Sequence, residues 1–218
     1  WYRRANVLKH KEAYNFYITT DFATSEKTSG DFSVISVWAY TNKGDWLWVD
    51  GICERQLMDK NIDDLFRLAQ MWGPQAVGVE ISGQQKGFIS WIQSEMQNRN
   101  IYFPLASDKT SGEPGIRPTT NKMARFNIVV PLFKAHKIFF PEELRHTRPM
   151  IEAIDELTLA APGGFKSKKD DFIDTISMLG AITAWKPSEV TPTPDASQDI
   201  WGEWETPDNS TALDSYLV

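Results

Sequence analysis

Cysteine and histidine are scarce in this chain. Among its 218 residues there are three histidines and a single cysteine, Cys53. A lone cysteine excludes a disulfide within the chain, and so few thiols also exclude a cysteine-rich zinc site. The lack of disulfides is typical of proteins that work in a reducing compartment such as the cytoplasm.

Long apolar runs are missing as well. Hydrophobic residues make up 41% of the chain, which is enough for a core, but no run approaches the ~18 residues of a membrane-spanning helix. The basic segment at residues 1–12 lacks the apolar stretch of a signal peptide. We therefore expect no membrane partner, and one domain of medium size with flanking segments.

Basic residues are absent from the end of the chain. Residues 187–218 hold seven Asp or Glu and no Lys or Arg, so the rest is near neutral although the net charge is −6. Residues 109–148 hold eight Lys or Arg against three Glu, which favours binding of a polyanion. We expect a linker segment over residues 1–13, a domain over residues 14–186, and an acidic, Pro-rich, disordered tail over residues 187–218.

Alternation of apolar and polar residues predicts three early strands. They are expected at residues 14–22, 31–40 and 45–53. The turns between them are short, so the strands should form an antiparallel meander. Along the first strand, Ile18 and Tyr17 fall on opposite faces, and Asp21 shares the face of Tyr17.

The period then changes to that of helices. The pattern predicts a helix over 62–72 ended by Gly73-Pro74, a strand over 75–80, a helix from 82, a strand over 101–105, a loop over 106–119, a helix from 120 kinked or divided at Pro131, a strand over 138–140, a helix from 141 broken at Pro149, and a last helix over 168–185. This order predicts an α/β fold. Its mixed sheet has three antiparallel strands, then parallel strands, and is flanked by helices.

Acidic residues recur at informative places in this pattern. Asp21 ends the first strand, Glu80 ends the fourth, and Asp170, Asp171 and Asp174 lie on the last helix. A spacing of three or four residues puts the helical acids on neighbouring parts of one face. A solvated loop after the first strand and a solvated first turn of the last helix, where acids suit the helix dipole, are the alternative explanation.

Crowded carboxylates repel one another unless a cation neutralises them. Hard divalent ions with oxygen ligands do this, and the lack of nearby Cys or His favours Mg²⁺ or Mn²⁺. Two such ions about 4 Å apart can hold both the attacking and the leaving oxygen of a phosphoryl transfer. The acids therefore favour a metal-dependent reaction at phosphorus.

The order of these segments resembles the RNase H-like (retroviral integrase) superfamily. More narrowly, it is similar to the nuclease domain of the large terminase subunit of tailed double-stranded DNA bacteriophages. The resemblance covers roughly residues 15–185 and rests on the segments TTDFATSEKTSGDFSVISV, AVGVEISGQQ, NKMARFNIVVPLFKAHKIFFP and KKDDFIDTISMLGAI. It implies an RNase H-like mixed sheet.

The resemblance also implies a site. Asp21, Glu80 and Asp171 match the catalytic, metal-binding triad, Asp174 matches a further metal ligand, and Asp31 matches an auxiliary acid. The implied activity is that of a Mg²⁺- or Mn²⁺-dependent DNA endonuclease with two ions. It would cut concatemeric double-stranded DNA during viral genome packaging.

Five basic residues are candidate DNA-binding residues. They are Lys109, Arg117, Lys122, Arg125 and Lys134. Basic groups beside a carboxylate site let an acidic chain bind a polyanion with little sequence readout. A solvated helix face and loop is the alternative explanation for them.

Partners and location follow from the same resemblance. It implies double-stranded DNA, portal protein, the small terminase subunit and an ATPase domain of the same full-length chain, in the cytoplasm of the host cell. The sequence itself has no GxxxxGK[ST] motif, so ATP hydrolysis is not expected here. Two other functions stay open: a catalytically silent module that docks on DNA or capsid, and another RNase H-like nuclease such as a junction resolvase.

Overall fold

The computed structural model describes residues 1–23, 32–81, 86–118, 120–161, 164–165, 167 and 170–187. Asp31 and residues 188–218, most of the predicted acidic tail, lie outside these ranges. Of the helices described, none is long and apolar enough to cross a membrane.

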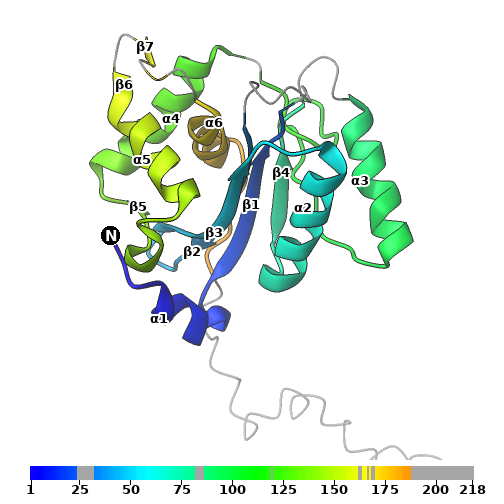
Figure 1. Cartoon of the computed structure of the whole chain (residues 1–218), viewed down its shortest axis with the longest axis horizontal. Coiled ribbons are helices and arrows are strands. Elements are labelled where there is room, and N and C mark those ends of the chain that lie inside the picture. Colours follow the sequence, from blue (N-terminus) through cyan, green and yellow to red (C-terminus); the bar gives the residue numbers. More distant parts are fainter. Residues whose placement is uncertain are drawn as a thin grey trace, which may run out of the picture. The chain divides into compact units, whose positions relative to one another are not determined.

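A mixed sheet of five strands runs through the described chain (Figure 1). The strands are β1 (Asn15–Asp21), β2 (Ser33–Tyr40), β3 (Trp46–Glu54), β4 (Ala76–Val79) and β5 (Ile138–Phe139), in the order β4-β1-β2-β3-β5. β1, β2 and β3 are antiparallel neighbours, β4 is parallel to β1, and β5 is parallel to β3. The predicted meander is confirmed, and β1 lies between β2 and β4.

Helices cover both faces of this sheet. They are α1 (Arg4–Lys9), α2 (Met58–Trp72), α3 (Lys86–Arg99), α4 (Lys122–Lys134), α5 (Arg148–Leu159) and α6 (Asp171–Ser177), with 3₁₀ turns η1 (Lys11–Ala13), η2 (Glu142–Leu144) and η3 (Met178–Gly180). In Figure 1, α2 and α3 lie on one side of the sheet and α4, α5 and α6 on the other. A separate small sheet pairs β6 (Ala160–Ala161) with β7 (Gly164–Phe165).

The alternation along β1 divides the core in two. Phe16 and Ile18 pack in a cluster with the apolar side chains of α2 and α3, whereas Tyr17 packs with those of α4, α5 and α6. Since successive side chains of a strand point to opposite faces, Asp21 lies on the face of Tyr17. The end of β1 therefore directs a carboxylate towards the layer that contains α6.

Residues 1–13, for which the sequence predicts a linker, contact the rest of the described chain. The Tyr2 backbone N–H donates to the Phe140 carbonyl at 3.0 Å, and Val7 of α1 is fully buried. Arg4 forms an ion pair with Asp50 at 3.3 Å. These residues therefore pack against β3 and the segment that follows β5.

The prediction of a strand over residues 101–105 is wrong, because this segment forms no regular strand. Only Leu105 forms an isolated bridge, with Val77 of β4. Pro104 has no N–H to donate, so a ladder cannot continue through it. Its carbonyl still accepts a hydrogen bond from the Val77 N–H at 2.8 Å, and the segment follows the edge of β4 without extending the sheet.

The prolines act differently from the prediction. α4 continues through Pro131 to Lys134 and is not divided. Pro149 stands in the first turn of α5, where a missing N–H costs nothing, so it begins that helix and does not break it. The predicted stop at Gly73 is confirmed, because Gly73 has φ +54° and donates to the Ala69 carbonyl at 2.9 Å.

The last helix is shorter than the predicted range of 168–185. Within the described residues it comprises α6 and η3 and ends at Gly180, where a Cβ atom would come within 2.9 Å of Ile128 Cγ2 on α4. The chain then runs along β1, and the Trp185 N–H donates to the Tyr17 hydroxyl at 2.8 Å. Hydrogen bonds to β1 side chains thus replace those of a continued helix.

Candidate active site

Two strand ends bring the first two predicted acids together. β1 and β4 are parallel, with Thr20 opposite Val79, so Asp21 and Glu80 follow side by side at the carboxyl end. The Glu80 N–H donates to the Thr20 carbonyl at 3.4 Å. Gly78 shares the face of Glu80, and a Cβ atom there would lie 2.6 Å from Met178 Sδ. The missing side chain lets η3 approach β4 closely.

α6 supplies the other two acids from above this edge. Asp171 and Asp174 lie in its first turn and are both buried. A hydrogen bond of 3.1 Å joins the hydroxyl of Thr175 on α6 to that of Ser36 on β2, and the Phe32 N–H donates to Asp171 Oδ2 at 3.0 Å. These buried contacts fix α6 against the sheet. The structure therefore brings all four predicted metal ligands to one edge.

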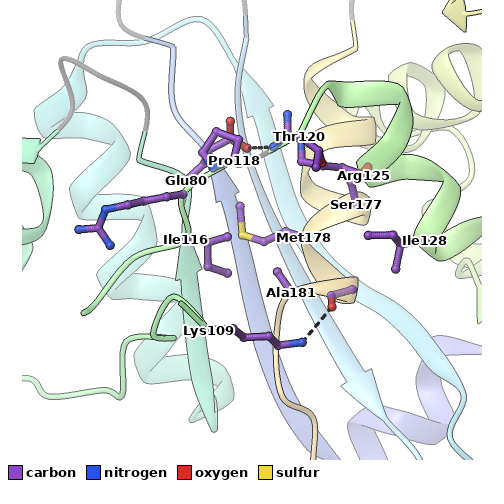
Figure 2. Close-up of a pocket in the computed structure, with 12 residues that line it drawn as sticks. Glu80, Lys109, Ile116, Pro118, Thr120, Arg125, Ile128, Ser177, Met178 and Ala181 are labelled. Carbon is purple, nitrogen blue, oxygen red and sulfur yellow. Dashed lines mark hydrogen bonds and ion pairs between the residues drawn. The ribbon is translucent and has the colours of Figure 1, made fainter. Parts of the chain in front are cut away.

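Two predicted DNA-binding residues lie on these acids. Arg125 of α4 contacts Glu80 Oε2 at 2.8 Å and Asp174 Oδ1 at 3.1 Å, as Figure 2 shows for Glu80. Lys122, one turn earlier, contacts Asp174 Oδ2 at 2.6 Å and Asp170 Oδ1 at 2.7 Å. Both cations neutralise carboxylates from β4 and α6. In this state they are held by the protein's own acids.

Neither cation contacts Asp21 directly, although the charge of Lys122 favours its ionised form. Its carboxylate forms no hydrogen bond or ion pair with any residue that the structure describes. Burial, followed by the charges of Asp174, Glu80 and Asp171, raises the pKa of Asp21 well above its usual range. Negative charge at this edge is therefore only partly neutralised by the described residues.

The neighbouring groups respond to the same field. Burial raises the pKa of Asp174 even though its hydrogen bond with Lys122 acts in the opposite direction. Burial works against a charged Lys122, but hydrogen bonds to Asp170 and Asp174 outweigh it and raise the pKa of the amine. Lys122 therefore stays protonated at any physiological pH.

The donor chemistry fits hard divalent ions. Asp21, Glu80, Asp171 and Asp174 offer only carboxylate oxygens, which Mg²⁺ and Mn²⁺ prefer. Within the parts of the chain that the structure describes, no three acidic, histidine or cysteine side chains form a ready-made metal-binding group. Glu80 and Asp174 both contact Arg125, so this arginine must move before the two carboxylates can share an ion.

The predicted residues Lys109 and Arg117 flank the acids on the far side of β4. With Glu80 and Arg125 they line a cavity of about 320 Å³ whose remaining wall includes apolar side chains of α4 and η3 (Figure 2). The Lys109 amine donates to the Gly180 carbonyl at 3.2 Å. These cations are therefore next to the acids but do not contact them.

The other two predicted site residues are Asp31 and Lys134. Asp31, the auxiliary acid, lies outside the described residues. Lys134 is exposed in the last turn of α4, and the helical rise puts it about 18 Å from Lys122 along the axis. Its predicted phosphate contact would lie well away from the acids.

Glu156 of α5 was not predicted as a site residue. It is buried, its Oε2 accepts from the Ile173 N–H of α6 at 3.0 Å, and its Oε1 has no partner among the described residues. Burial raises the pKa of Glu156 to about 7. The sequence does indicate that Glu156 is buried, because it follows Met150 and Ala153 at steps of three residues and i, i+3 neighbours share a helix face. Met150 and Ala153 are both buried.

No protein-family model matches this chain, and no curated protein sequence matches it significantly. The structure is similar to the human cytomegalovirus terminase nuclease domain. For the Mn-soaked, inhibitor-bound form the TM-score is 0.57 at 11% identity, over 81% of this chain and 86% of that one. Another structure of that domain gives 0.54 at 12% identity, over 81% and 87%. This likeness shows that the chain has the RNase H-like fold of terminase nucleases, as the sequence predicts.

A further similar structure comes from a bacteriophage. The large terminase nuclease of thermophilic phage G20c with bound magnesium has a TM-score of 0.48 at 17% identity, over 77% of this chain and 80% of that one.

Proposed function

We propose that this chain is a divalent-metal-dependent endonuclease domain that hydrolyses phosphodiester bonds of double-stranded DNA. The observation that carries this proposal is the convergence of four carboxylates from β1, β4 and α6 at one edge of the sheet, with cations of α4 beside them. The RNase H-like fold is consistent with it. The biological setting we propose is a viral packaging terminase, with an ATPase domain in the same full-length chain and with portal protein and small subunit as partners, in the host cytoplasm.

The acids would hold the ions. They are Asp21 at the end of β1, Glu80 after β4, and Asp171 and Asp174 in the first turn of α6. When bound, Mg²⁺ or Mn²⁺ would activate water and stabilise the charge that develops at phosphorus. No protein nucleophile is needed.

The cations would respond to the substrate. A DNA phosphate offers Arg125 and Lys122 an alternative anionic partner, and guanidinium binds phosphate oxygens in a bidentate manner. Transfer of Arg125 from Glu80 and Asp174 to a phosphate would free both carboxylates. DNA binding and ion binding would therefore support each other.

Nicking of supercoiled plasmid in Mn²⁺, Mg²⁺ or EDTA tests the proposal. We expect cleavage that requires the metal and falls to background in Asp21→Asn and in Asp171→Asn, while thermal unfolding shows both variants folded. Asp45→Asn is a matched control, because Asp45 is a partly buried acid that pairs with Lys137 at 2.7 Å near the opposite end of β3. Cleavage in EDTA, or full activity of Asp21→Asn, would refute the proposal. Binding without cleavage would indicate a docking module.

A further inference from the structure

Two exposed arginines lie over one aromatic ring beside the acids. The guanidinium carbons of Arg55 and Arg148 are 4.3 and 4.9 Å from the centroid of the Phe32 ring. Phe32 itself is buried, and its backbone N–H donates to Asp171 Oδ2 at 3.0 Å. The two arginines therefore pack on the same residue whose backbone N–H positions Asp171, a predicted metal ligand.

The Phe32 ring restricts both side chains, and the ring itself carries no charge. Cation–π contact is worth roughly 0.5–1 kcal/mol at exposed sites and leaves the guanidinium edge able to bind an anion. Arg148 also pairs with Glu54 at 2.8 Å, but the two side chains are 49% and 44% exposed. Exposed pairs contribute little to stability, so Arg148 can exchange Glu54 for a phosphate.

The sheet order places this pair relative to the acids. Glu80 follows β4, Asp21 ends β1, Phe32 precedes β2 and Arg55 follows β3, all at the same edge. Strands are about 4.8 Å apart, so Arg55 lies two strand spacings, about 10 Å, from the Asp21 position. B-DNA advances 3.4 Å per nucleotide of one strand along its axis, so 10 Å corresponds to about three nucleotides.

We propose that Arg55 and Arg148 form a subsite for a DNA backbone phosphate about three nucleotides from the bond that is cut. The inference rests on the proposed nuclease function. Lys109 and Arg117 occupy the opposite flank, beyond β4. The bound strand therefore crosses the strand ends from β3 to β4, with the acids in the middle. The subsite reads backbone charge and carries no sequence preference.

Binding of a short labelled duplex to the full chain, followed by fluorescence anisotropy with Ca²⁺ in place of Mg²⁺, tests the subsite. The test variant is R55Q/R148Q. The matched control is R67Q/R99Q, which removes the same charge from the α2–α3 layer: Arg67 is 49% exposed and pairs with Asp64, and Arg99 lies 4.8 Å from the Phe66 ring.

The expected result is a change in salt dependence. Between about 50 and 200 mM salt, R55Q/R148Q should lower the slope of log K against log salt by about 0.9 in magnitude, since the subsite binds one phosphate and each neutralised phosphate contributes about 0.9. At low salt its affinity should fall roughly tenfold. The control should bind like the wild type.

A second variant tests the subsite even if R55Q/R148Q does not fold. R55K/R148K keeps both charges but lacks the planar fork, so it should keep the salt slope and lose affinity severalfold. If R55Q/R148Q has the wild-type salt slope, or R55K/R148K the wild-type affinity, the proposed subsite is refuted and the proposed nuclease function is not. A wild-type chain that does not bind the duplex overturns the proposed function, and the subsite with it.

Discussion

Arg125→Gln removes the cation that joins β4 to α6. The guanidinium lies 2.8 Å from Glu80 Oε2 and 3.1 Å from Asp174 Oδ1, and the three side chains are 19%, 13% and 6% exposed. Glutamine is shorter and uncharged. Without metal, the variant therefore leaves two poorly solvated carboxylates facing each other beside Asp21.

The size of the effect follows from burial. Removing one partner of a buried ion pair costs about 3–5 kcal/mol. Lys122 still neutralises Asp174 in the variant, so we expect about half of this, ~2 kcal/mol. In a domain of this size, 1 kcal/mol changes Tm by about 2–4 °C, which predicts a decrease in Tm of roughly 4–8 °C in EDTA.

A divalent ion should reverse this loss. Mn²⁺ can neutralise Glu80 and Asp174 in place of the guanidinium, and in the wild type it must first displace Arg125. We therefore expect tighter Mn²⁺ binding in the variant without DNA, and a larger rise in its Tm. An ion at about 100 times its Kd adds ~2.7 kcal/mol to the free energy of unfolding, enough to restore the wild-type Tm.

Thermal unfolding followed by circular dichroism, in EDTA and in Mn²⁺, measures the first effect, and titration calorimetry measures the affinity. Arg67→Gln is the control, since its exposed pair with Asp64 should contribute less than about 1 kcal/mol. If Arg125→Gln has the wild-type Tm in EDTA and the wild-type response to Mn²⁺, then Arg125 does not occupy the place of an ion and the metal-site assignment of Glu80 and Asp174 fails.

Three further predictions concern single side chains. Asp21→Asn should raise the free energy of unfolding in EDTA by ~1 kcal/mol or more while abolishing nicking, because a neutral amide ends the repulsion that raises the pKa of Asp21; a Tm at or below that of the wild type would contradict this. Glu156 has a folded pKa of about 7 against an ordinary value of 4.5, so the folded chain binds the extra proton and the free energy of unfolding falls as pH rises from about 4.5 to about 7. Glu156→Gln should remove this component in metal-free melts across that range, and parallel curves for the two proteins would disprove it. Gly115 has φ +92°, and a Cβ atom there would lie 2.0 Å from Ile81 Cδ1, so Gly115→Ala should lower the free energy of unfolding in urea by about 3 kcal/mol. The control is Gly112→Ala, with φ +70° and open space around it, which should lower it by about 1 kcal/mol. Equal losses in the two variants would show that close packing at Gly115 is not the cause.

Local patterns in the sequence determined the sheet and the placement of its acids. Period-two alternation over β1 assigned Asp21 to the face of Tyr17, and the structure shows that this face meets α4, α5 and α6. Short turns predicted the antiparallel meander, and the parallel placement of β4 follows from its crossover connection. Parallel neighbours end at the same edge, so the meeting of Asp21 with Glu80 follows from the strand order of the fold that the sequence resembles.

The ends of elements were predicted less well, because they depend on contacts that are distant in sequence. The apolar pattern after Ser177 reads as more helix, yet the chain leaves η3 at Gly180 and bonds to β1 through Trp185 and Tyr17. Leu105 likewise reads as part of a strand, but Pro104 limits its pairing to one bridge.

Only the tertiary structure decided which charges meet. Phe32 and Asp171 are 139 residues apart, and Arg125 is 45 residues from Glu80, so no periodicity links them. Arg125 was predicted as a phosphate contact from its type and region, whereas packing of α4 against α6 directs it onto Glu80 and Asp174. The periodicity of the sequence indicates which face of its own helix or strand a side chain lies on. Which residue it contacts there depends on how the helices and the sheet pack against each other.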